Sequence, residues 1–151
     1  MPRIARRLYH EAMEKILSQT GYKYRTINLG NILVHKMDRR LYVNVAGKNL
    51  PYTDRSFPWE THIRPRRLDD IEFSARKYDA EPWIAFCYYV LENSYRKDFS
   101  PLISIDKHYF GAKFITVKDY RANMQPRSPS WGEVDLPREK VLHLTLDSPN
   151  I

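Results

Sequence analysis

The sequence predicts an α/β fold, a mixed β-sheet of about five to seven strands with helices packed on its faces. Three features indicate this class: an amphipathic stretch near the N-terminus, a series of short segments after it, and a continuous apolar run of strand length. The chain has 151 residues, of which 42% are hydrophobic and 28% are charged. This size and composition are typical of a soluble globular domain, and we expect a single domain over residues 1–151.

A first helix is expected over residues 3–18, "RIARRLYHEAMEKILS". Its apolar residues recur at spacings of three and four, which gives the helix one apolar stripe. The stripe consists of Ile4, Ala5, Leu8, Ala12, Met13, Ile16 and Leu17. Gly21 is expected to end the helix, because glycine readily adopts the left-handed conformation found at helix ends.

Three short strands are expected next, over residues 22–28, 31–36 and 40–46. The connections "NLG" and "MDRR" are short enough for hairpins, so neighbouring strands should pair. Residues 47–66 contain three prolines and no periodicity, which predicts a long loop. Loops of this kind often carry functional residues.

The rest of the chain predicts a second helix and further strands. The helix is expected in "RLDDIEFSARKYDA", where Asp69, Asp70 and Glu72 favour the first turn through the helix dipole. After Pro82, the run "WIAFCYYVL" predicts a central strand covered on both faces. Strands are also expected in "SPLISIDK", "GAKFITV" and the final "KVLHLTL", with a helical turn around "KDYRANMQ" and a proline-broken segment in "PRSPSWGEVDLPRE".

Composition excludes several classes of protein. No apolar run approaches the roughly 18 residues of a membrane span. The N-terminus is charged and lacks an apolar signal core, so we expect a cytoplasmic protein that binds no membrane. Cys87 is the only cysteine, which excludes an internal disulfide. The five histidines are scattered, so no zinc site of the usual ligand spacing is present in the sequence.

Positive charge is concentrated near the N-terminus. The formal net charge is +7, and residues 1–40 hold nine Lys/Arg against three acids, which accounts for +6 of it. A localised basic surface attracts polyanions, because bound phosphates release condensed counterions. Arginine outnumbers lysine by 15 to 10, and its planar guanidinium suits phosphate groups and base edges. Nucleic acid is one interpretation of this charge, and a solvated basic face is the other.

Four stretches together resemble the PD-(D/E)XK, or restriction-endonuclease-like, nuclease superfamily. They are "YHEAMEKILSQTGY" as a first helix, "GNILVHKMDRRLYVNVAGK" as a hairpin, "LDDIEFSARKYDA" as a second helix and "EPWIAF" as the following strand. The resemblance covers residues 9 to 86 and depends on element order and hydrophobic pattern. It implies a core of helix, three-strand meander, helix and strand, in the order α-βββ-α-β, and a role in binding or cutting DNA or RNA.

The positions that carry the chemistry in that superfamily differ here. The superfamily has an Asp on the second strand and an acid-x-Lys on the third; the carboxylates hold a divalent cation and the lysine helps to orient the attacking water. The matching positions of this chain are Asn31, Asn44 and Ala46. Amide oxygens bring no negative charge and alanine has no ammonium group, so the resemblance implies a nucleic-acid-binding protein that is catalytically weak or inactive.

An active Mg²⁺- or Mn²⁺-dependent nuclease with displaced acids is the alternative. Glu11 on the first helix and Asp38 in the hairpin turn would then be the metal ligands. Lys48 would replace the missing lysine if the third strand continues through Gly47, and Glu72 is a further acid on the second helix. The simpler interpretation of each of these groups is a solvated surface charge.

Arginines are the candidate contacts for nucleic-acid phosphates. They lie on the first helix, in the hairpin turn and in the loop "FPWETHIRPRR": Arg3, Arg7, Arg39, Arg40, Arg64, Arg66 and Arg67. In the loop, Phe57 and Trp59 stand near the arginines, a combination that can hold unpaired bases. Under the alternative interpretation these aromatic residues anchor the loop on the domain.

Two weaker hypotheses complete the set. Glu60 and His62 have the residue types of an acid–base pair, although this spacing also recurs by chance. The aromatic loop would also suit a protein partner, which would make the chain an interaction or assembly module. A homodimer is left open by the sequence.

Overall fold

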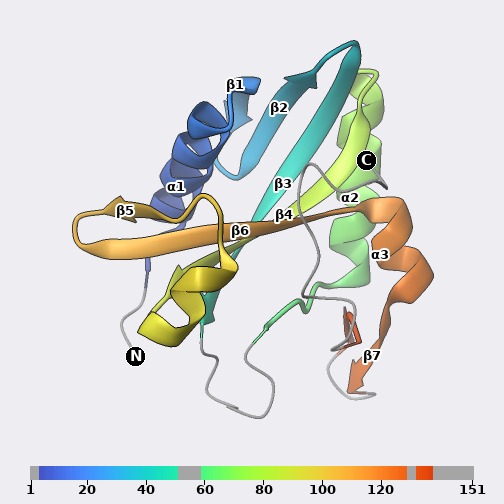
Figure 1. Cartoon of the computed structure of the whole chain (residues 1–151). Helices are drawn as coiled ribbons and strands as arrows, with labels where there is room; N and C mark the ends of the chain where they lie inside the picture. The colour runs from blue at the N-terminus through green and yellow to red at the C-terminus, as the bar shows by residue number, and fades with distance from the viewer. Residues whose placement is uncertain (1–3, 51–58, 129–131, 138–151) are drawn as a thin grey trace.

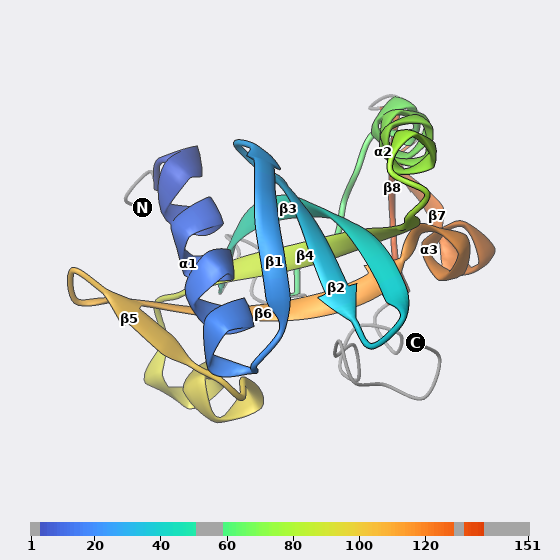
Figure 2. The same cartoon turned by 90° about the horizontal axis from the view of Figure 1, so that it is seen from above.

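The computed structural model describes residues 4–50, 59–128 and 132–137, which form a curled mixed sheet between helices (Figures 1 and 2). The helices are α1 (Arg6–Gln19), α2 (Pro65–Lys77), the 3₁₀ helix η1 (Asn93–Asp98) and α3 (Val117–Asn123). The main sheet contains β1 (Lys23–Asn28), β2 (Asn31–Lys36), β3 (Arg39–Leu50), β4 (Glu81–Val90), β5 (Ile103–Ile105) and β6 (His108–Thr116). A separate small sheet pairs β7 (Gln125–Ser128) with β8 (Glu133–Asp135).

The strand order of the main sheet is β1-β2-β3-β4-β6-β5. β1, β2 and β3 form an antiparallel meander, and β3 pairs in parallel with β4 after the crossover through α2. β6 then pairs antiparallel with both β4 and β5. This topology confirms the predicted α/β class with a mixed sheet, and its first six elements follow the predicted α-βββ-α-β order.

Two hydrophobic layers lie on opposite faces of the sheet because successive strand residues point to opposite sides. The α1 layer takes Leu41, Val43 and Val45 from β3, together with the buried stripe of α1. The α2 layer takes Tyr42 and Ala46 from the same strand, together with Leu68, Ile71 and Ala75 of α2. Figure 2 shows α1 on one side of the sheet and α2 with α3 on the other.

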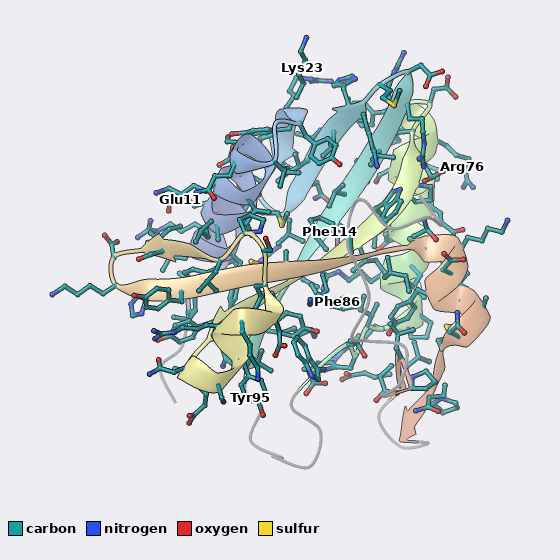
Figure 3. The ribbon with its side chains drawn as sticks, viewed as in Figure 1. Glu11, Lys23, Arg76, Phe86, Tyr95 and Phe114 are labelled. Carbon is teal, nitrogen blue, oxygen red and sulfur yellow. The ribbon has the colours of Figure 1, made fainter. Side chains whose placement is uncertain are left out.

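The central strand β4 is buried on both faces, as its continuous apolar sequence predicts. Trp83, Ala85 and Cys87 belong to the α1 layer, whereas Ile84 and Phe86 belong to the α2 layer. Phe86 lies near the middle of the molecule in Figure 3. Burial on both faces explains why β4 shows no alternation of polar and apolar residues.

β3 is longer than the sequence predicts. It runs through Gly47 to Leu50, because β4 supplies parallel partners as far as the pair Leu50–Val90. Gly47 is required by packing at this point, since a Cβ atom there would lie 2.4 Å from Cδ2 of Tyr9. Residues 47–50, expected in a loop, are therefore strand, and Asn44, Ala46 and Lys48 share one face of it.

α2 begins at Pro65, two residues earlier than the predicted helix. Proline is favoured in the first helical turn because its missing N–H has no intrahelical partner there and its φ suits the helix. The earlier start leaves no acidic residue in the first turn, so the dipole argument made for Asp69, Asp70 and Glu72 was wrong. It also places Arg66 and Arg67 in that first turn.

The remaining elements agree in part with the sequence. The strands β5 and β6 and the helix α3 confirm three predictions. The small β7–β8 sheet was not predicted, because its segment was interpreted as proline-broken. The predicted last strand, "KVLHLTL", lies outside the described residues. None of the helices that the structure describes has the length and hydropathy needed to cross a membrane.

Candidate nucleic-acid site

The two asparagines at which the sequence resemblance would place acids face each other in the sheet. Asn31 on β2 and Asn44 on β3 are direct cross-strand partners. Nδ2 of Asn44 donates to Oδ1 of Asn31 at 2.8 Å, and Nδ2 of Asn31 donates to Oδ1 of Asn28 at 2.5 Å. Asn28, Asn31 and Asn44 thus form a row of amides that bond to one another, which we call the amide row.

Arg67 of α2 completes this row. Its Nε donates to Oδ1 of Asn44 at 2.8 Å, and its Nη2 donates to the carbonyl oxygen of Val45 at 3.0 Å. Burial lowers the pKa of Arg67, and the positive charge of Arg6 lowers that pKa further. A guanidinium remains charged in proteins despite such a shift. A cationic side chain is therefore bound at the position where the resemblance implies a metal cation.

The third position of the motif lies inside the core. Ala46 is buried in the α2 layer and offers no polar group. Lys48, two residues further along the same face, reaches the segment before α2, where its Nζ donates to the carbonyl oxygen of His62 at 2.9 Å. Because β3 continues through Gly47, the side chains of Ala46 and Lys48 lie on the same face of the strand. This is the arrangement that the alternative with displaced residues requires of Lys48.

A first cavity of about 450 Å³ adjoins the amide row, between the start of α1 and the β1–β2 turn. Its lining includes Arg6, His10, Gly30, Asn44 and Arg67. His10 is buried, and its Nδ1 accepts from the backbone N–H of Gly30 at 2.9 Å. Gly30 has φ +87, a left-handed conformation that glycine adopts without steric cost. The buried imidazole thus fixes the turn that borders the cavity.

A second cavity of about 470 Å³ lies on the other side of Arg67, which lines both. Its lining residues are Lys48, His62, Ile63, Arg64, Arg66, Arg67, Asp70 and Glu133. Arg64 and Arg66 are exposed at the start of α2. We call the two cavities together the arginine cleft, defined by Arg6, Arg64, Arg66 and Arg67.

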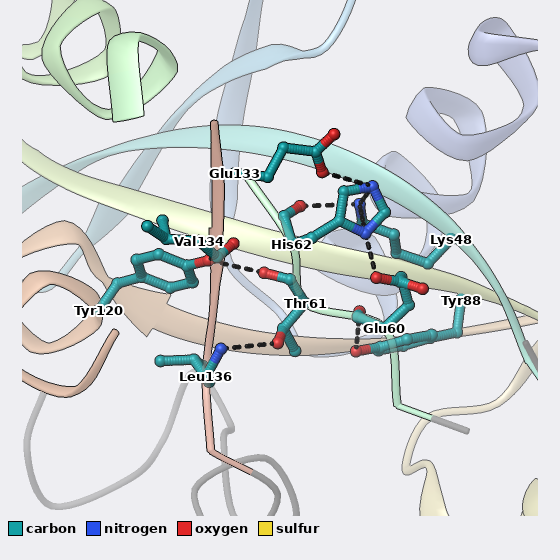
Figure 4. A network of polar contacts seen from close by, with 9 residues as sticks. All are labelled: Lys48, Glu60, Thr61, His62, Tyr88, Tyr120, Glu133, Val134 and Leu136. Carbon is teal, nitrogen blue, oxygen red and sulfur yellow. Dashed lines mark hydrogen bonds and ion pairs between the residues drawn. The ribbon is translucent and has the colours of Figure 1, made fainter. Parts of the chain in front are cut away.

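A polar network forms one wall of the second cavity (Figure 4). The side chain of Glu60 is buried and contacts Nδ1 of His62, and Nε2 of His62 lies 3.4 Å from Oε2 of Glu133. Nζ of Lys48 lies 3.5 Å from Nδ1 and 3.4 Å from Nε2 of the same ring. One imidazole is therefore surrounded by two carboxylates and an ammonium group.

Backbone contacts hold this network in place. Tyr88 donates its hydroxyl to the carbonyl oxygen of Glu60 at 2.9 Å, and Tyr120 donates to that of Thr61 at 2.7 Å. Thr61 in turn accepts from the backbone N–H of Leu136 at 3.0 Å. An isolated bridge between Ile63 and Val134 joins the segment to β8. The residues around His62 are thus anchored to β4, α3 and β8.

The displaced acids do not converge on the amide row. Asp38 lies in the turn between β2 and β3, next to the pair Lys36–Arg39. That pair is five residue pairs from Asn31–Asn44, which is about 17 Å along the strands. Glu11 projects from the outer side of α1 (Figure 3), where its nearest described cation is Arg7 at 4.0 Å. Within residues 4–50, 59–128 and 132–137, no three His, Cys, Asp or Glu side chains are grouped to hold a metal. The structure therefore does not assemble the metal site proposed on Glu11 and Asp38.

Glu72 also turns away from this region. Its Oε1 accepts from Arg121 of α3 at 3.0 Å from Nε and 2.5 Å from Nη2. Arg121 also contacts Asp69 at 2.7 Å. These acids join α2 to α3 and are not available to the amide row.

The arginines of the N-terminal 40 residues that the structure describes include two separate groups. Arg39 contacts Glu81 at 2.6 Å and Arg40 donates to the carbonyl oxygen of Tyr78 at 3.0 Å, both at the hairpin end of β3. Arg6 lines the cleft at the other end of the meander, and Arg7 is exposed beside it on α1. The structure thus separates the hairpin arginines from those of α1, and it does not form the single N-terminal surface expected from charge. Arg3 lies outside the described residues.

Trp59, the aromatic residue of this loop that the structure describes, anchors the loop to the domain. Trp59 is buried and packs edge-on against Tyr88 at a centroid distance of 5.4 Å. It also packs against Phe99 at 5.6 Å. Phe57 lies outside the described residues. Stacking of bases on Trp59 would require the side chain to leave the core, so the structure favours the anchoring interpretation for this residue.

Sequence reasoning missed two residues of the site, His10 and Glu133. Arg6 was expected on a basic surface that contacts phosphates, whereas His10 was placed off the apolar stripe. The position of His10 on the helix gave no signal that its ring reaches the β1–β2 turn. Glu133 lies in the segment interpreted as proline-broken, and its approach to His62 joins residues far apart in the sequence.

No family model matches the chain, and no curated protein sequence matches it. Among solved structures, the chain is similar to Hjc, a Holliday junction resolvase from the archaeal hyperthermophile Archaeoglobus fulgidus. The match has a TM-score of 0.45 and 10% sequence identity, and it covers 87% of this chain and 84% of that one. A likeness at this level does not bear on activity or on the residues that would carry it.

Proposed function

We propose that this protein binds nucleic acid through phosphate contacts in the arginine cleft, and that the amide row performs no metal-dependent hydrolysis. The observation that carries the proposal is the hydrogen bond of 2.8 Å from Nε of Arg67 to Oδ1 of Asn44. It supplies positive charge within a nuclease-like topology at the point where a metal would be needed for cleavage.

The charge of the cleft suits a phosphate backbone. Arg64 and Arg66 are exposed at the mouth of the second cavity and Arg6 is exposed at the first. The described lining of the two cavities contains only two acids, Asp70 and Glu133, against these arginines and Lys48. Guanidinium groups bind phosphates with paired, charge-assisted hydrogen bonds, which position a strand without reading its sequence.

The amide row does not suit a divalent cation. Mg²⁺ prefers oxygen ligands with negative charge and near-octahedral geometry. Asn31 and Asn44 offer neutral oxygens, and the oxygen of Asn44 already accepts from Arg67. A divalent ion at this position would also be repelled by the guanidinium, so binding of nucleic acid should not require Mg²⁺.

The test is a binding titration with labelled duplex DNA, single-stranded DNA and RNA at two salt concentrations, each with and without EDTA. The double variant Arg64→Gln/Arg66→Gln should bind more weakly than wild type and lower the salt slope by about one unit per arginine at most. The matched control is Arg76→Gln/Lys77→Gln, which removes two exposed charges from the last turn of the same helix. Arg7→Gln and Arg40→Gln test the two other candidate surfaces separately.

Three results would contradict the proposal. Wild type that binds none of the probes at low salt would exclude nucleic acid as a partner. Equal losses in the cleft variant and the control variant would mean that binding follows net charge and is not localised. Binding that disappears in EDTA would show that a metal takes part.

A further inference from the structure

The two cavities of the arginine cleft differ in charge. Among the described residues, none that lines the first cavity carries a carboxylate, whereas the lining of the second includes Asp70 and Glu133. The guanidiniums of Arg6 and Arg67 both line the first cavity. Burial lowers the pKa of Arg67, and the positive charge of Arg6 lowers that pKa further. Two cations thus share one space, and an anion bound there would relieve their repulsion.

The polar side chains of the first cavity differ in whether the fold already uses them. The hydroxyl of Tyr9 donates to Oδ1 of Asn49 at 3.0 Å. Asn44 bonds within the amide row, and both ring nitrogens of His10 have partners. Arg6, in contrast, is exposed and has no hydrogen bond or ion pair within the part of the chain that the structure describes. Its guanidinium is therefore available to a ligand.

The first cavity also has apolar residues in its lining. Ile4 is half-buried there, and Leu29 of the β1–β2 turn is 46% exposed. Leu29 is one of three large hydrophobic side chains that stay exposed in the described part of the chain, and a ligand in the cavity would cover it. The volume of about 450 Å³ lies within the roughly 300–1,000 Å³ usual for small-molecule sites. A ligand that fits this lining combines an anionic group with an apolar ring.

We propose that the first cavity binds a nucleotide through its terminal phosphate, with Arg6 and Arg67 on the phosphate and Leu29 against the base. A terminal phosphate is a monoester with a charge of about −1.5 to −2 near pH 7, whereas an internal phosphate of a strand carries about −1. Two guanidiniums without a described carboxylate in the lining suit the more highly charged group. Two sources share this chemistry, the phosphorylated end of a strand and a free mononucleotide. For the strand end, the inference rests on the proposed function.

The position of Arg67 favours a terminal phosphate over an internal one. Arg67 is the only described residue that lines both cavities, and its bonds to Asn44 and Val45 hold it between them. A strand that continued from one cavity into the other would have to pass this side chain. A strand held by Arg64 and Arg66 in the second cavity can instead end at Arg67, with its terminal phosphate in the first cavity.

The experiment measures binding of matched probe pairs in EDTA. One pair is a labelled single strand with a phosphate or a hydroxyl at its 5′ end, a second pair differs in the same way at the 3′ end, and a third is a mononucleotide and its nucleoside. Wild type should bind the phosphorylated member of a pair about tenfold more tightly, as expected of one added charge-assisted contact. Arg6→Gln should bring this ratio close to one.

Two control variants separate the first cavity from the rest of the surface. Arg7→Gln removes the neighbouring exposed arginine of α1, which is outside the cavity lining, and should keep the ratio. Arg64→Gln/Arg66→Gln removes charge from the second cavity, so it should weaken both members of a strand pair alike and also keep the ratio. Inorganic phosphate should compete more weakly than the mononucleotide, because it leaves Leu29 uncovered.

A preference for phosphorylated strands identifies a strand end as the source, and a preference confined to the third pair identifies a free mononucleotide. Strands that bind equally with and without a terminal phosphate, together with no preference in the third pair, would overturn this inference and leave the proposed function intact. A preference that persists in Arg6→Gln, or inorganic phosphate that competes as well as the mononucleotide, would also overturn it. No binding of any strand would overturn the proposed function, and the third pair would still decide whether the cavity takes a nucleotide.

Discussion

Arg67 donates from Nε to Oδ1 of Asn44 at 2.8 Å, so a residue of α2 and a residue of β3 share one hydrogen bond. The same guanidinium reaches the carbonyl oxygen of Val45 at 3.0 Å. Two acceptors of β3 are thus satisfied by one side chain of α2. The bond joins the helix to the sheet and also gives the cleft its central positive charge.

Removal of this guanidinium should destabilise the protein. Arg67→Met keeps most of the aliphatic stem but leaves Oδ1 of Asn44 and the oxygen of Val45 without their donor. Partly buried acceptors that lose their partners cost about 1–3 kcal/mol. Chemical denaturation should therefore show a lower free energy of unfolding for Arg67→Met. Arg67→Lys should recover little, because an ammonium group cannot reproduce the planar fork.

The control for this prediction is Arg66→Met, which removes a neighbouring arginine that is exposed. Its free energy of unfolding should stay within about 0.5 kcal/mol of wild type, as is usual for surface substitutions. Equal destabilisation by Arg66→Met and Arg67→Met would mean that general charge, and not the bond to Asn44, accounts for the effect.

A second prediction concerns the metal. Wild type should show no saturable Mn²⁺ binding at the amide row, whereas the triple variant Asn31→Asp/Asn44→Asp/Arg67→Ala should bind the ion. The variant restores two facing carboxylates and removes the cation that repels Mn²⁺. The double variant Asn31→Asp/Asn44→Asp, with Arg67 kept, should bind Mn²⁺ weakly, because the guanidinium pairs with the new carboxylate.

Electron paramagnetic resonance of free Mn²⁺ measures this binding directly. Saturable binding by wild type that is lost in Glu11→Ala/Asp38→Ala would instead support the nuclease with displaced acids. The distance of Asp38 from the amide row argues against that result, since metal ligands must lie about 2.0–2.6 Å from the ion.

The sequence predicted the fold better than the site. The stripe of α1 and the continuous apolar run of β4 are local patterns, and both specify which faces are buried. The extension of β3 was missed because Gly47 resembles a strand end, whereas its role is to admit the ring of Tyr9. That role depends on a side chain 38 positions earlier in the chain.

The site depends on contacts that no local pattern specifies. His62 meets Glu133 only because β8 pairs with the segment before α2 through Ile63 and Val134. Arg67 meets Asn44 only because the crossover helix lies over β3. The residue types were visible in the sequence, and Arg67, Asn44, Lys48 and His62 were all singled out there.

A third prediction tests the close approach of Tyr9 to β3. A Cβ atom at position 47 would lie 2.4 Å from the ring of Tyr9, so Gly47→Ala should displace the ring and lower the free energy of unfolding by about 1–3 kcal/mol. The double variant Tyr9→Ala/Gly47→Ala should lose less than the sum of the single variants, because the clash is absent without the ring. Chemical denaturation of all four proteins completes the cycle.

The hydroxyl of Tyr9 provides the control. It donates to Oδ1 of Asn49 at 3.0 Å, and Tyr9→Phe removes this bond while it keeps the ring. Tyr9→Phe/Gly47→Ala should therefore show losses that add, in contrast to the variant without a ring. Additive losses in both cycles would show that Gly47 acts through the backbone of β3 and not through Tyr9.

The last prediction concerns alkaline pH. Burial raises the pKa of the Cys87 thiol, and burial also raises the pKa of Tyr88, with the charge of Glu60 as the next cause. Burial raises the pKa of Tyr120 as well. The folded protein therefore holds these protons more tightly than the unfolded chain does. Below the ordinary pKa of each group both states are protonated and stability is unaffected, whereas above it only the unfolded chain releases its proton.

Stability should consequently fall as pH rises above the ordinary value of 9.0 for Cys87, and more steeply above 10.0, where the tyrosines begin to contribute. Each group adds a slope of up to about 1.4 kcal/mol per pH unit. Denaturation at pH values from neutral to strongly alkaline measures the loss of free energy of unfolding. In the Cys87→Ala variant, the part of this loss that begins near pH 9.0 should be absent. Tyrosinate absorbance should show Tyr88 and Tyr120 ionising only as the protein unfolds. A stability that stays constant through this range, or ionisation of all tyrosines in the folded protein, would contradict the burial of these groups.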